Sequence, residues 1–169
     1  AILAAAPWDD FKLKAAVLEG HALVAQKKYA EAIERFNDAL AMKIEIPMAE
    51  QLQLDASLGK ATSLAESGQV EQAIAMVTNV IERAEPEAAE LHARAYNALG
   101  HCHLKAGHQK DALLAFLHVD VLYSGYPAAH AEALYHLAPL WEAIGQGERA
   151  RQARELLSDR YPNSRWIKQ

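Results

Sequence analysis

The 169-residue sequence has little of several residue types, and each shortage excludes a class of protein. Its single cysteine, Cys102, excludes an internal disulfide framework and a cysteine-rich zinc site. Only 8 glycines and 6 prolines interrupt stretches of strong helix formers, which argues against a β-sandwich or barrel. No apolar run approaches the roughly 20 residues that a membrane-spanning helix needs. The sequence therefore predicts an all-α chain without a membrane span.

Basic residues are also in short supply. The chain has 17 lysines and arginines against 22 aspartates and glutamates, so its formal net charge is −5. Non-specific nucleic-acid binding requires a basic surface, so no nucleic-acid partner is predicted. In contrast, 51% of the residues are hydrophobic, which is enough to build a sizeable core and excludes a disordered tail.

Four similar segments recur along the chain, each centred on an alanine. Taking Ala32, Ala73, Ala112 and Ala150 as anchors gives spacings of 41, 39 and 38 residues. A small residue stands twelve positions before each anchor, a turn candidate stands five before it, and a proline closes each unit. The small residues are Gly20, Ala61, Gly100 and Ala138; the turn candidates are Lys27, Gly68, Gly107 and Gly145; the prolines are Pro47, Pro86, Pro127 and Pro162. This regularity predicts four copies of one structural unit.

Each unit has the pattern of a helical hairpin. Apolar residues recur at steps of three and four, as expected for helices with one buried face. A pair of small residues, such as Gly100 and Ala112, lets two antiparallel helices approach closely. Glycine in the turn suits the left-handed conformation that ends a helix, and proline suits the first turn of the next one. We expect helices over residues 8–27, 29–43, 48–67, 70–84, 87–106, 109–123, 128–144 and 147–160.

The pattern resembles the tetratricopeptide repeat family. The best match is the third unit, with Tyr96, Leu99, Gly100, Gly107, Ala112 and Phe116. The resemblance covers about residues 13–164, although these units are longer than the usual 34 residues. It implies an all-α, right-handed superhelical solenoid of about four helix-turn-helix hairpins. We expect one domain over residues 1–169, with units at 13–46, 54–87, 93–126 and 131–164 and with caps at 1–12 and 165–169.

Two unit ends carry a further pattern. Tyr126-Pro127 and Tyr161-Pro162-Asn163-Ser164 resemble a bacterial subgroup with Tyr-Pro-x-Ser endings, which includes cell-envelope proteins such as the periplasmic Tol–Pal coordinator. This second resemblance rests on short motifs. It leaves the bacterial cytoplasm and the periplasm both open as the compartment.

The family resemblance also implies a function. Tetratricopeptide repeats line a concave groove mainly with the first helix of each hairpin, and the groove captures a peptide or helix of a partner protein. The groove positions of the family fall on Lys14, Val17, His21, Asp55, Leu58, Thr62, Arg94, Asn97, His101, Lys105 and Tyr135. The chain is therefore expected to be a protein-interaction scaffold.

One stretch of the expected groove is basic. Arg94, Asn97, His101 and Lys105 are spaced for one helical face, so a carboxylate is expected there if anywhere. Some family members bind acidic chaperone C-termini through a clamp of Lys, Asn and Arg. Val17, His21 and Gly59 stand where that clamp needs Lys and Asn, so this specific activity is not expected.

Two alternative functions remain open from the sequence. The chain could be a structural module whose unit ends stack into a homo-oligomer or a larger array, or a regulatory domain that senses a small ligand or peptide. An enzyme is not expected, because no serine has a nucleophile-elbow context and Gly59-Lys60-Ala61-Thr62 lacks the first glycine of a phosphate loop. No cofactor is predicted.

Metal binding is not predicted either, although the chain has 8 histidines. The most suggestive group is His101-Cys102-His103. On a helix, residues i and i+2 diverge by about 200°, so His101 and His103 cannot share an ion. Cys102 lies on an apolar face and is expected in the core, while His108 falls in a turn.

Overall fold

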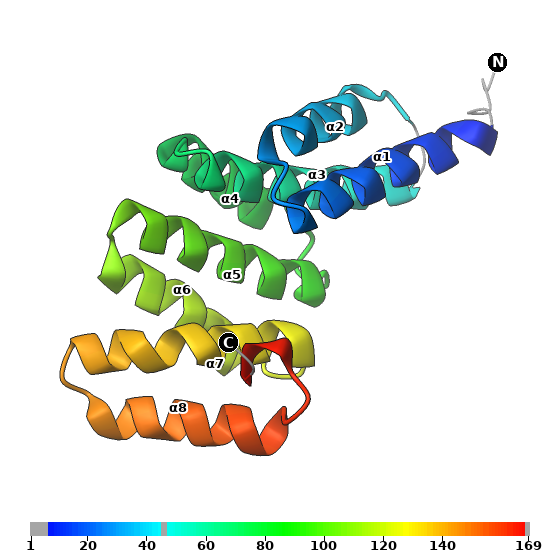
Figure 1. Cartoon of the computed structure of the whole chain (residues 1–169). Coiled ribbons are helices and arrows are strands. Elements are labelled where there is room, and N and C mark those ends of the chain that lie inside the picture. Colours follow the sequence, from blue (N-terminus) through cyan, green and yellow to red (C-terminus); the bar gives the residue numbers. More distant parts are fainter. Residues whose placement is uncertain (1–6, 45–46, 168–169) are drawn as a thin grey trace. The chain divides into compact units, whose positions relative to one another are not determined.

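The computed structural model of the chain describes residues 7–44 and 47–167 (Figure 1). Within these ranges, every regular element is helical. The first four helices are α1 (Pro7–Ala25), α2 (Tyr29–Ala41), α3 (Pro47–Glu66) and α4 (Val70–Arg83). They are followed by α5 (Ala89–Ala106), α6 (Gln109–Leu122), α7 (Pro127–Ala143), α8 (Gly147–Arg160) and the short 3-10 helix η1 (Arg165–Ile167). Each helix boundary lies within two residues of the position predicted from the sequence.

The helices form four hairpins in two compact units. Residues 1–84 contain the hairpins α1–α2 and α3–α4, and residues 85–169 contain α5–α6 and α7–α8. Within each unit the second hairpin packs on the first, since α3 contacts both α1 and α2, and α7 contacts both α5 and α6. The all-α fold of stacked helical hairpins is therefore confirmed. The handedness of the superhelix, the single domain and the unit bounds remain predictions.

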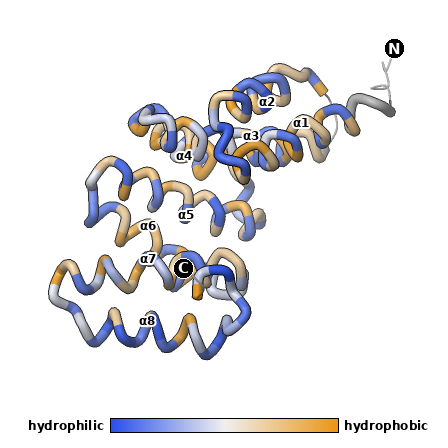
Figure 2. Tube along the Cα trace, viewed as in Figure 1, coloured by the Kyte–Doolittle hydropathy of each residue, from blue (hydrophilic) through white to orange (hydrophobic). Residues whose placement is uncertain are grey.

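Only part of the two predicted caps lies in the described ranges. Residues 1–6 and 168–169 fall outside them. Residues 7–12 belong to α1, and Arg165–Ile167 form η1, which packs against α7. Before η1, the preceding helix α8 carries hydrophilic residues along much of its length (Figure 2). This fits the polar outer face that a terminal repeat needs.

The turn inside each hairpin has one backbone design. Lys27, Gly68, Gly107 and Gly145 all have positive φ, between 60° and 85°. One residue later, the backbone N–H donates to the carbonyl five residues back, with N···O distances of 2.8–2.9 Å in all four hairpins. This bond closes the end of the first helix and starts the second. The repeat position requires this left-handed conformation, and Lys27 adopts it although its Cβ makes the conformation unfavourable.

A phenylalanine on the second helix locks the first hairpin of each unit together. Phe36 on α2 is fully buried against Gly20 of α1 and Gly59 of α3. Phe116 on α6 is likewise fully buried, against Gly100 of α5. A Cβ added to any of these glycines would lie under 3.0 Å from the phenylalanine ring. The small residues of the repeat pattern thus make room for these rings.

Candidate functional site

The six groove residues predicted within residues 1–84, the first compact unit, lie in different environments. Lys14 is exposed, while Val17 and Leu58 are 2% and 4% exposed and belong to the buried core. His21 and Asp55 are brought together from α1 and α3, with 3.1 Å between Nε2 and Oδ2. Thr62 is half-buried and donates its hydroxyl to the Leu58 carbonyl at 3.0 Å. Of these six residues, four therefore present side-chain atoms at the surface.

In the second unit, Arg94 and Lys105 are exposed on α5, and His101 and Tyr135 are half-buried. Asn97 is only 3% exposed. Its Nδ2 donates to the Ala129 carbonyl at 2.8 Å and lies 3.4 Å from Glu132 Oε2. Asn97 thereby ties α5 to the first turns of α7. The Asn97 side chain therefore holds α7 in place and is not itself exposed to a ligand.

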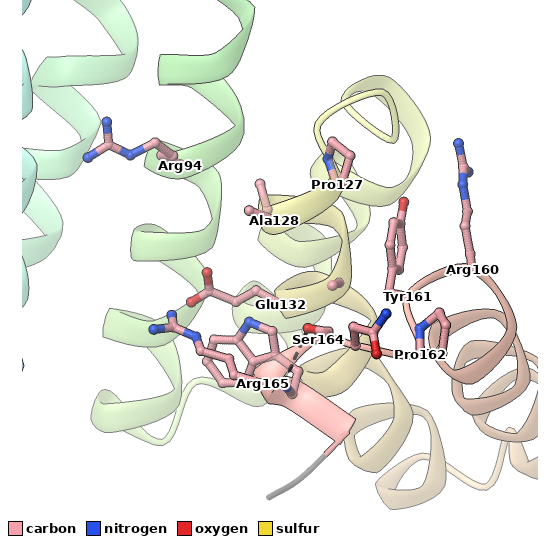
Figure 3. A pocket seen from close by; sticks show the side chains of 13 residues that line it. Arg94, Pro127, Ala128, Glu132, Arg160, Tyr161, Pro162, Ser164 and Arg165 are labelled. Carbon is pink, nitrogen blue, oxygen red and sulfur yellow. Dashed lines mark hydrogen bonds between the residues drawn. The ribbon is translucent and has the colours of Figure 1, made fainter.

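Beside Asn97, a pocket of about 660 Å³ opens in the second unit. The first turns of α7 form one side of it, and the segment that follows α8 forms another (Figure 3). Arg94 of α5 also lines it, although the guanidinium of this residue points away from the other labelled side chains. Its lining is Arg94, Pro127, Ala128, Ala129, Ala131, Glu132, Arg160, Tyr161, Pro162, Asn163, Ser164, Arg165 and Trp166. We call this the α5–α7 pocket. Three arginines and one carboxylate thus surround a mainly apolar lining.

Glu132 is the acidic group of the α5–α7 pocket. In Figure 3 its carboxylate lies beside the Arg165 side chain. Burial raises the pKa of Glu132, and this outweighs the lowering by the positive charges of Arg165, His101 and Arg94 and by the hydrogen bond from Asn97. The carboxylate is therefore costly to ionise in this place despite its basic neighbours.

An aromatic cluster continues from the α5–α7 pocket along α7. The ring of Trp166 lies 5.1 Å from that of Tyr135 and 5.4 Å from that of His136, measured between centroids. His136 also stacks on Phe116 at 4.8 Å. Trp166 lines both the α5–α7 pocket and a second cavity of about 520 Å³. The C-terminal segment thus folds back and covers part of the surface that the sequence assigned to Tyr135.

Sequence reasoning missed a polar network centred on His130. This side chain is 1% exposed on α7. Its Nε2 lies 2.8 Å from Asp120 Oδ1, and its Nδ1 lies 2.6 Å from the Tyr161 hydroxyl. Both ring nitrogens of this buried imidazole therefore have a hydrogen-bond partner, the Asp120 carboxylate and the Tyr161 hydroxyl. The network joins α6, α7 and the end of α8, and it gives the tyrosine of the Tyr-Pro-x-Ser ending a structural role.

Removing the Tyr161 hydroxyl should destabilise the chain measurably. In Tyr161→Phe the buried Nδ1 of His130 loses its hydrogen-bond partner, so the free energy of unfolding should fall by about 1–3 kcal/mol. Urea denaturation of wild type, Tyr161→Phe, His130→Leu and the double variant measures the coupling between the two side chains. Additive effects would show that this hydrogen bond contributes nothing.

Of the described residues, one group of three could hold a metal ion. His103, His108 and Asp111 each offer a ligand atom, and these atoms all lie within 4.8 Å of one another. Sequence reasoning compared His101 with His103 on one helix and did not connect residues across the turn.

The described helices include none that is long and apolar enough to cross a membrane.

Part of the chain matches a known protein family. Residues 58–127 match the family model of the tetratricopeptide repeat. The comparison with curated proteins finds no match. Together with the stacked helical hairpins, the family match supports the assignment of this chain to the tetratricopeptide repeat family. The tetratricopeptide repeat is a non-catalytic repeat fold and in general a protein-interaction module.

Proposed function

From this family assignment, we propose that the chain is a protein-interaction scaffold that binds a peptide segment of a partner in the α5–α7 pocket. The observation that carries the proposal is the pocket itself, about 660 Å³ between α5, α7 and the C-terminal segment. This volume is within the range that holds a small ligand or a few peptide side chains. The pocket also uses α5 and α7, which are the first helices of their hairpins and line the groove in this family.

The pocket lining specifies a peptide with an apolar side chain. Pro127, Ala128, Ala131, Pro162 and Trp166 provide apolar contacts with little conformational freedom to lose. Trp166 is half-buried and already fixed by Tyr135, so it presents a preformed surface. An aromatic or aliphatic anchor of the partner would bury apolar area here without reorganising the unit.

The charges around the pocket specify an acidic group beside that anchor. Arg94, Arg160 and Arg165 border the pocket, and Glu132, the one acid of the lining, is made costly to ionise by burial. In Figure 3 the Arg165 side chain lies beside Glu132, whereas the Arg94 and Arg160 side chains point outward from the pocket. A carboxylate of the ligand would first meet the Arg165 guanidinium, a group that binds carboxylates through paired hydrogen bonds, and Arg94 would meet it by rotating its side chain. The proposed ligand is therefore an extended segment with an apolar residue next to aspartate, glutamate or a C-terminal carboxylate.

A direct test starts from peptides selected by display on the immobilised full chain. Fluorescence anisotropy then gives the Kd of a selected peptide for wild type, Arg94→Glu and Arg165→Glu. We expect each charge reversal to weaken binding by at least about tenfold, since it replaces an attraction by a repulsion in a partly desolvated site. Added salt should weaken wild-type binding as well.

Lys110→Glu is the matched control, because it reverses one exposed charge on α6 outside the pocket lining. It should leave the Kd within about twofold of wild type, which corresponds to less than about 0.5 kcal/mol. Equal losses in all three charge reversals would indicate a non-specific charge effect. No loss in Arg94→Glu and Arg165→Glu would place the binding surface elsewhere and contradict the proposal.

A further inference from the structure

The turn between α5 and α6 gathers three metal-ligating side chains. His103 lies in the last turn of α5, His108 directly before α6, and Asp111 in the first turn of α6. Their candidate ligand atoms lie within 4.8 Å of one another, and the two imidazole rings are 5.9 Å apart between centroids. His103 is half-buried, while His108 and Asp111 are exposed, so an ion could reach the group from solvent.

The backbone holds these three residues together. Gly107 has φ of +78°, and the His108 N–H donates to the His103 carbonyl at 2.9 Å. The His108 carbonyl accepts from the Ala112 N–H at 3.0 Å, which fixes the first turn of α6 and with it Asp111. The two histidines are thus the two ends of the hydrogen bond that closes the turn. The backbone of the turn thus fixes where the three side chains start.

The other three hairpins show what these positions normally do. Their turns have the same closing hydrogen bond at 2.8–2.9 Å, so the backbone positions correspond. The residues that correspond to His103, His108 and Asp111 are Leu23, Lys28 and Glu31 in the first hairpin, Leu64, Gln69 and Gln72 in the second, and Trp141, Gln146 and Arg149 in the fourth. The first position is apolar in all three. In the fourth hairpin the same two outer positions form a contact, with the Arg149 guanidinium 4.7 Å from the Trp141 ring centroid.

The third hairpin therefore departs from the repeat in a chemically specific way. It replaces an apolar packing residue by histidine and places nitrogen or oxygen ligands at all three positions. Packing alone does not require this, since leucine or tryptophan serves in the other hairpins. From this geometry we propose that His103, His108 and Asp111 bind a divalent transition-metal ion, with zinc as the best fit.

The ligand set is typical of zinc in two respects. Two imidazoles and one carboxylate are the protein ligands of many zinc sites that keep a fourth position open for water. Imidazole also favours zinc, copper or nickel over magnesium and calcium, which prefer oxygen ligands. Tetrahedral zinc with ligand bonds of about 2.0–2.2 Å needs ligand atoms roughly 3.3–3.5 Å apart. Ligand atoms within 4.8 Å of one another must therefore approach by up to about 1.5 Å.

A bound ion would cross-link the end of α5 to the start of α6. Because it would bind the folded hairpin and not the unfolded chain, it would stabilise the second unit in proportion to the free zinc concentration. This function is separate from peptide binding, since none of the three ligands lines the α5–α7 pocket.

Titration of the untagged chain with zinc chloride, followed by calorimetry, tests the proposal. We expect one zinc per chain and a rise of the melting temperature with zinc concentration. Cobalt should bind at the same place and give visible absorption bands of a tetrahedral ion. His108→Ala and Asp111→Asn change exposed side chains, so the variants should fold and should lose at least about tenfold in zinc affinity.

Two further variants make the result specific. His118→Gln removes another exposed histidine of α6 and should keep the wild-type affinity. His103→Leu restores the residue type of the first two hairpins, so it should retain the fold by circular dichroism and lose zinc binding. The proposal is overturned if wild type binds no zinc at about 100 µM, far above the dissociation constants of structural zinc sites. It is also overturned if His108→Ala and Asp111→Asn bind zinc as wild type does.

Discussion

Phe36→Ala is expected to lower the free energy of unfolding of the first unit by about 3–5 kcal/mol. The ring is fully buried between α1 and α3, and its neighbours Gly20 and Gly59 have no side chains that could fill the space left behind. His21 contacts the ring edge-on at 5.2 Å between centroids and would lose this contact too. The loss therefore combines the apolar area of the ring with a cavity that cannot collapse.

Urea denaturation of the full chain, followed by circular dichroism, measures this effect. The matched comparison is Gly59→Ala, whose new Cβ would lie 2.2 Å from the Phe36 Cζ. Overpacking of this kind lowers the free energy of unfolding by about 1–3 kcal/mol. Adding Phe36→Leu to Gly59→Ala should recover part of this loss, because leucine is smaller than phenylalanine and leaves room for the new Cβ. A loss below about 1 kcal/mol in Phe36→Ala would show that this ring does not hold the hairpins together.

The second large effect is a loss of stability in mild acid caused by His136. Its pKa is lowered from 6.5 to about 4, first by burial and then by the charge of His101. Between these two values the unfolded chain binds a proton that the folded chain does not bind. Folding stability therefore falls as the pH drops from about 6.5 to about 4, and it loses no more from this group below pH 4. The shift from 6.5 to about 4 corresponds to at most roughly 3.5 kcal/mol, because one pKa unit is about 1.4 kcal/mol.

His136→Phe isolates this contribution. Phenylalanine preserves the ring contacts with Phe116, Tyr135 and Trp166 and has no proton to bind. We expect the difference in unfolding free energy between variant and wild type to grow in favour of the variant as the pH falls from 7 to 4. A pH-independent difference for His136→Phe would contradict the account of this residue.

Much of the fold follows from patterns that are local in the sequence. The spacing of small residues and turn candidates predicted all four hairpins, and even Lys27 adopts the left-handed conformation that its repeat position requires. Gly20 and Gly100, two small residues of the repeat pattern, also lie at close helix contacts, against the rings of Phe36 and Phe116. Such features are predictable because each depends on residues that lie within one repeat of the sequence.

The site depended on contacts that the sequence does not reveal. Asn97 falls on the expected groove face of α5, yet the Ala129 carbonyl and Glu132 of α7 bury it. The α5–α7 pocket exists because the segment after α8 folds back, a path for which the repeat pattern has no signal. The His130 network joins residues 10 and 31 positions apart in the sequence, so no local motif marks it.

The most direct test of the central claim is a map of where a selected peptide binds. Amide chemical-shift changes of the labelled full chain during titration with the peptide would supply this map. Our account predicts that the largest changes fall around Arg94, on the first turns of α7 and on residues 161–167, and that they disappear in Arg165→Glu. Changes confined to the exposed faces of α2, α4, α6 or α8 would contradict it, because the working surface would then lie on the second helices of the hairpins.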